Sequence, residues 1–194
     1  SAASDVYKRQ AEFDALPDKY KSAAKRHKRL WDEAIERMRS SIGFLEVNED
    51  ARSAFKLANE AMALQFGWGF EGANLTWRPF QLGFQLLVLK SLLDREDDHR
   101  SVMDLLWFPT GGGKTEAYFA LFAAVIFYRR LRSKSENGDP DQGAGVAVIM
   151  RYTLRLLTTQ QFERATRLIC ACDAIRRRDT ERLGQTQISI GMWV

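Results

Sequence analysis

The spacing of hydrophobic residues predicts helices over the first third of the chain. Apolar side chains recur there at the spacing expected for one face of a helix. The two runs consist of Leu30, Ala34 and Met38, followed by Phe55, Ala58, Met62 and Phe66. The sequence Ser-Ile-Gly at 41–43 predicts a break between two helices, and Asn48 is expected to begin the second.

Strands and helices are expected to alternate in the rest of the chain. Pro79 suits the first turn of a helix that runs to about Leu93. Further helices are predicted over 114–132 and from about 153 to 178, and strands over 102–108, 146–150 and about 187–193. The helix from 114 is apolar almost all round, so we expect a sheet to bury it. Alternation of this kind predicts parallel β-α-β units.

These patterns divide the chain into three parts. Residues 1–10 resemble a translated sequencing scar and are set aside, 11–75 form a helical N-terminal extension, and 76–194 form the β-α-β domain. The chain starts without Met, and its last residues predict a strand with no closing element. We therefore expect a fragment of a longer protein.

A glycine-rich loop before the helix from 114 carries the clearest chemistry. Gly111, Gly112 and Gly113 lack a Cβ, so their backbone can wrap closely around phosphates and present N–H groups to them. Lys114 can reach the β- and γ-phosphates, and the hydroxyl of Thr115 can bind Mg²⁺. This loop predicts a P-loop that binds ATP with Mg²⁺, in which Lys114 and Thr115 are the catalytic residues.

The sequence around this loop resembles motif I of the superfamily 2 helicases, Pro-Thr-Gly-x-Gly-Lys-Thr, at 109–115. Phe108 departs from the general P-loop pattern, which has Gly or Ala there. Upstream, Arg78 and Gln81 resemble the Q motif of the same helicases, which reads adenine. A Gln amide offers a donor and an acceptor in one plane, as the edges of adenine require. The resemblance implies that Arg78, Gln81 and Thr110 join the loop in binding ATP.

Residues 151–161 follow the second predicted strand and resemble motif Ia of these helicases. The positions that match in register are Arg155, Leu157 and Gln160, whereas Thr-Leu replaces the usual Pro-Thr. A helix start with hydroxyl and cationic groups can hold a phosphate of a nucleic-acid strand. The resemblance implies this role for Arg151, Arg155 and Thr158. The alternative is a buried helix whose arginines are merely solvated.

Over about residues 54–194 the sequence around these motifs is most similar to large bacterial helicases of the DISARM phage-defence type. The resemblance implies an α/β fold, an incomplete RecA-like parallel sheet preceded by a helical extension. It also implies an ATP-dependent helicase or translocase acting on single- or double-stranded nucleic acid, with DNA favoured over RNA. Motif II, the arginine finger and a C-terminal RecA-like domain are absent from the sequence. We therefore expect this fragment to bind ATP without appreciable hydrolysis.

Other classes of protein remain open at this stage. A P-loop kinase or GTPase uses the same loop, although the Q-like block argues against it. A nucleotide-gated scaffold would bind ATP without turnover. The net charge of +4 fits a polyanionic partner but does not require one. The longest apolar stretch, 119–128, is too short to span a bilayer, so we expect no membrane partner and a cytoplasmic location.

Overall fold

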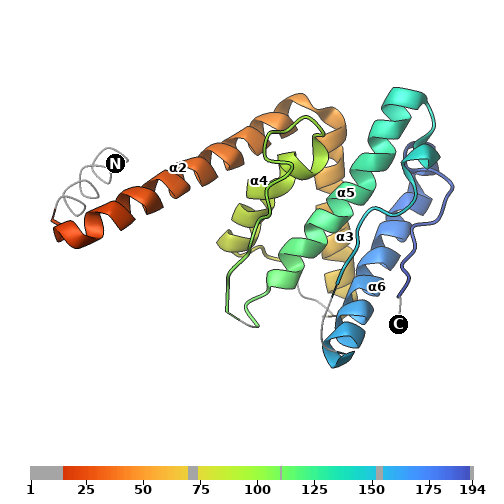
Figure 1. Cartoon of the computed structure of the whole chain (residues 1–194). Helices are drawn as coiled ribbons and strands as arrows, with labels where there is room; N and C mark the ends of the chain where they lie inside the picture. Colours follow the sequence, from red (N-terminus) through yellow and green to blue (C-terminus); the bar gives the residue numbers. More distant parts are fainter. Residues whose placement is uncertain (1–14, 70–73, 110, 152–154, 193–194) are drawn as a thin grey trace.

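The computed structural model describes residues 15–69, 74–109, 111–151 and 155–192. The helical elements in these ranges are α2 (Asp18–Val47), α3 (Glu49–Gly69), α4 (Pro79–Leu93), α5 (Lys114–Asn137), the 3₁₀ helix η1 (Pro140–Gly143), α6 (Arg155–Arg178) and α7 (Thr180–Leu183). Helices α3, α5 and α6 lie side by side, and α2 projects away from them (Figure 1). No helix in the described ranges is long and apolar enough to cross a membrane.

The predicted α/β fold class is wrong, because the described residues form a helical fold without a RecA-like sheet. The three segments expected to be strands, 102–108, 146–150 and 187–192, run as open chain without helix, turn or bend. Among the described residues, no backbone–backbone hydrogen bond joins these segments. Apolar runs favour an extended backbone, but a sheet forms only where a neighbouring strand lies within hydrogen-bonding distance. The sequence pattern therefore predicted where these open segments lie, but the prediction that they pair into a sheet was wrong.

The boundary between α2 and α3 differs from the expected one. Gly43 does not end a helix, since α2 continues to Val47. Asn48 separates the two helices: its backbone N–H donates to Phe44 O, and its Oδ1 accepts from Ala51 N, both at 2.9 Å. An Asn side chain that caps a helix in this way satisfies a free N–H of the first turn. The predicted start at Asn48 and the helix Pro79–Leu93 are confirmed.

An alanine face on α3 allows α5 to pack closely against it. The alanines of this face are Ala51, Ala54, Ala58 and Ala61, which are at most 1% exposed. Their spacing places them on one side of the helix. Phe119 and Phe127 of α5 belong to the same buried core, which extends to α4 and α6. Helix α5 is therefore buried as predicted, but by other helices rather than by a sheet.

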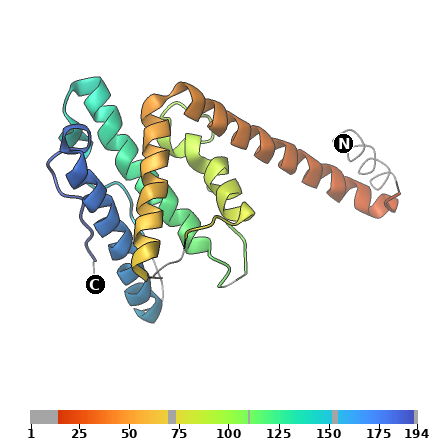
Figure 2. The same cartoon turned by 180° about the vertical axis from the view of Figure 1, so that it is seen from behind.

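Helix α2 is attached to the rest of the fold by its C-terminal half. The hydroxyl of Ser41 is buried and accepts from Lys90 N of α4 at 3.1 Å. Arg37 forms two hydrogen bonds, of 2.7 and 2.8 Å, with the carboxylate of Asp104. Further toward the N-terminus α2 projects away from the other helices (Figure 2). Of the apolar face expected there, Leu30 is exposed, whereas Ala34 and Met38 are half-buried.

The alanine face gives a testable prediction. Ala58→Leu should lower the free energy of unfolding by about 1–3 kcal/mol, because the added side chain has no room between α3 and α5. Ala63→Leu is the matched control, since Ala63 lies on the exposed side of the same helix and should change stability by less than about 0.5 kcal/mol. Urea unfolding measures both. Equal losses in the two variants would contradict close packing at Ala58.

Candidate nucleotide-binding site

The glycine loop that precedes α5 adopts a conformation that other residues resist. Gly111 has φ +78° and Gly113 has φ +89°, both in the left-handed region that favours glycine. Gly112 is needed for a different reason, since a Cβ there would stand 2.4 Å from Cδ1 of Phe108. Each of the three glycines is therefore required by the shape of this loop.

Two side chains from the start of α4 hold the loop. Nε2 of Gln81 donates to Gly113 O at 2.7 Å, and Oε1 of Gln81 accepts from Arg78 N at 2.9 Å. Nη1 of Arg78 donates to Gly112 O at 2.9 Å. The structure thus brings Arg78 and Gln81 into contact with the loop, although Gln81 and Gly113 are 32 positions apart in the sequence.

Lys114 lies over its own loop. Its Nζ donates to Phe108 O at 2.5 Å and to Pro109 O at 3.1 Å. The first turn of α5 supplies N–H groups that have no partner within the helix, and Thr115 supplies a hydroxyl. Together with the ammonium of Lys114, this set of donors fits an anionic phosphate group. A phosphate bound there must draw Lys114 away from the two carbonyl oxygens.

Phe108, the departure from the P-loop pattern, is stacked on Phe80 of α4. The ring centroids are 3.8 Å apart and the rings are inclined by 12°. This stack places an aromatic ring directly against Gly112. Sequence reasoning missed the pair, although Phe80 lies within the Q-like block and an aromatic residue at 108 was the sole irregular position of the loop.

Glu116 connects the start of α5 with α6. Its Oε1 accepts a hydrogen bond from Nη2 of Arg164, whose guanidinium lies 5.8 Å from the ring centroid of Phe119. Its Oε2 is buried and has no hydrogen-bond partner among the described residues. No signal in the sequence points to this contact with Arg164, because the register of a distant helix is not visible locally.

The residues expected to contact nucleic acid are only partly described. Arg151 is exposed and follows the open segment 146–150. Arg155 begins α6, but its side chain and that of Thr158 lie outside the described part, as does Thr110. The nucleic-acid contacts of Arg151, Arg155 and Thr158 therefore stay predictions.

Two glycine substitutions, one in the loop and one in α2, should change the free energy of unfolding in opposite directions. Gly113→Ala should lower the free energy of unfolding by about 1–2 kcal/mol, because alanine resists a positive φ. Its Cβ would also stand 2.8 Å from Nε2 of Gln81. Gly43→Ala, in α2 with no atom within 4 Å, should raise that free energy by up to about 1 kcal/mol. Urea unfolding of both variants checks this, and a neutral Gly113→Ala would argue against the described loop.

Comparison with known proteins shows sequence similarity to a bacterial protein. No protein-family model matches the chain, and no solved structure matches it. The chain is 43% identical over 176 residues to the DISARM protein DrmA of Bacillus paralicheniformis (strain ATCC 9945a / NCIMB 11709 / CD-2). That match covers 82% of this chain. The chain is therefore a homologue of part of the DISARM protein DrmA, and it spans 16% of that relative's length.

Proposed function

We propose that this chain is the nucleotide-binding part of an ATP-driven nucleic-acid motor, a helicase or translocase, that acts in DISARM phage defence. The observation that carries the proposal is the clamp on the glycine loop, in which Arg78 and Gln81 bond the carbonyl oxygens of Gly112 and Gly113. The similarity to DrmA supports the link with DISARM. The proposal rests on the loop and its clamp and does not need a RecA-like sheet.

In this proposal ATP places its phosphates at the start of α5. Lys114 leaves the two loop carbonyls and binds the phosphates, while the hydroxyl of Thr115 holds Mg²⁺. The metal supplies charge that neutralises the phosphate oxygens when it is bound. The amide of Gln81 uses one N–H and one lone pair on Gly113 and Arg78, which leaves one donor and one acceptor. Because Gln81 is 5% exposed, its surroundings must open for these groups to reach adenine.

The nucleic-acid strand is proposed to lie at the start of α6. Arg151, Arg155 and Thr158 would hold its phosphates through charge and hydroxyl groups. Glu116 and Arg164 then join the two proposed sites, since Glu116 lies in the first turn of α5 and Arg164 belongs to α6. We propose DNA as the strand because the helicases that this sequence resembles serve in defence against phage.

Lys114→Ala tests nucleotide binding. It should weaken the affinity for a fluorescent ATP analogue by about 10- to 100-fold, because charge-assisted hydrogen bonds to phosphate are lost. The free energy of unfolding should stay nearly unchanged, since the hydrogen bonds of the Lys114 ammonium within the described part of the chain go to two loop carbonyls. Lys56→Ala is the control, as Lys56 is exposed on α3 and distant in sequence from the loop. Equal affinity for wild type and Lys114→Ala would end the proposal.

Salt dependence tests the strand contacts. The double variant Arg151→Ala/Arg155→Ala should bind single-stranded DNA more weakly whatever its sequence. The slope of log affinity against log salt concentration should become shallower by about 0.7 for each lost phosphate contact. Arg95→Ala removes one exposed cation elsewhere and should leave the slope as it is. An unchanged slope in the double variant would show that neither arginine contacts a phosphate.

A further inference from the structure

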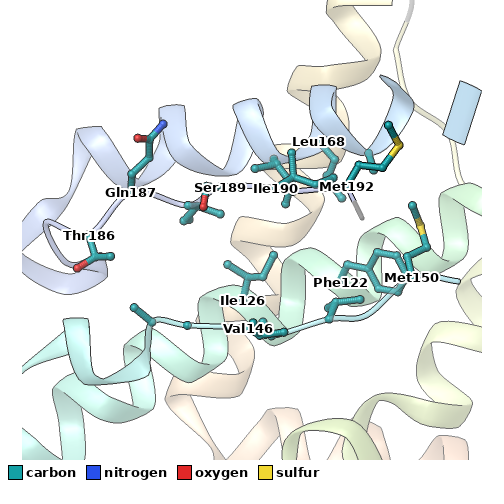
Figure 3. Close-up of a pocket in the computed structure, with 18 of the residues that line it drawn as sticks. Phe122, Ile126, Val146, Met150, Leu168, Thr186, Gln187, Ser189, Ile190 and Met192 are labelled. Carbon is teal, nitrogen blue, oxygen red and sulfur yellow. The ribbon is translucent and has the colours of Figure 1, made fainter. Parts of the chain in front are cut away.

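A cleft separates two of the open segments that sequence patterns had marked as strands. It has a volume of about 780 Å³, and segments 146–150 and 186–192 form its walls. The two walls run in the same direction on either side of the opening (Figure 3). The floor is formed by Phe122 and Ile126 of α5 and by Leu168 of α6, and Arg130 and Arg151 also line the cleft.

The backbone of both walls has no backbone partner in the part of the chain that the structure describes. Among the described residues, no backbone–backbone hydrogen bond involves 146–150 or 186–192. On the wall 186–192, Ile188 is 6% exposed and lies between its exposed neighbours Gln187 and Ser189. Side chains already bond Val146 O, Thr186 N and Ile188 N. The other N–H and C=O groups of each wall are offered as they are at the edge of a sheet.

Side chains from the helices hold both walls in place. Arg129 of α5 donates to Ala144 O at 2.9 Å and to Val146 O at 2.5 Å. On the other side, Asp173 of α6 accepts from Ile188 N at 3.0 Å. Burial opposes ionisation of Asp173, but its bonds to Arg176 and Ile188 lower its pKa below the usual value. The cleft is thus preformed, with its two walls fixed independently.

The size of the cleft matches a short stretch of polypeptide. A strand rises about 3.3 Å per residue, lies about 4.8 Å from its neighbours and takes about 10 Å of thickness in a packed layer. These spacings give about 160 Å³ per residue, so a cleft of about 780 Å³ has room for a short extended segment.

We propose that this cleft receives one extended segment of a partner polypeptide, which binds as an added strand between the two walls. Its backbone pairs with both rows of unpartnered groups, and apolar side chains at alternate positions face α5 and α6. A small apolar ligand would leave those backbone groups unpaired. This chain keeps its helical fold, because the strand belongs to the partner. The inference is independent of nucleotide binding.

The test uses the 194-residue chain and a seven-residue peptide with valine at alternate positions, threonine between them and lysine at both ends. At a peptide concentration ten times its dissociation constant, hydrogen exchange of wall amides should slow about tenfold on both walls. The amide of Ile188 is an internal reference, since it is already bonded to Asp173. The same peptide with N-methylated backbone is the matched control and should give no protection.

Two variants keep the test sharp. Ala165→Trp places a large ring in the floor and should abolish peptide binding. If that variant fails to fold, Ser189→Pro serves instead, because it removes one wall N–H from an exposed position and should weaken binding. Protection of one wall only, equal binding of the N-methylated peptide, or protection that grows with protein concentration without peptide would each overturn the proposal. The last result would show a second copy in the cleft.

Discussion

The close contact between the alanine face of α3 and helix α5 is the constraint on which the other features depend. Alanine brings the two backbones near each other because it adds almost no bulk. The position of α5 then sets several features at once, since α5 begins at the glycine loop, forms part of the cleft floor and carries Arg129. A shift of this one helix would move the loop and the cleft together.

The loop itself depends on contacts from outside α5. Gln81 and Arg78 reach it from α4, and Phe80 of the same turn holds Phe108. One turn of a second helix therefore supports the loop by two polar contacts and one aromatic contact. This arrangement explains how a large ring is accepted next to Gly112, where the usual pattern has a small residue.

Local signals in the sequence predicted what local physics decides. Pro79 marked the start of α4, and the glycines marked the start of α5, because both residue types restrict or free the backbone where they stand. The contact between Gln81 and the loop was expected through the resemblance of both segments to helicase motifs. The sheet was predicted wrongly, since pairing depends on neighbours that periodicity cannot show. The bond between Glu116 and Arg164 was invisible for the same reason.

The side chain of Lys114 lies within its own glycine loop. Its ammonium rests on Phe108 O and Pro109 O, so any anion that enters competes with two carbonyl dipoles for the same cation. A singly charged ion offers little more than those dipoles do, whereas a triphosphate offers several charged oxygens at once. If the loop binds nucleotide as proposed, it therefore selects by charge density before any base or sugar is recognised, and small singly charged anions compete poorly for it.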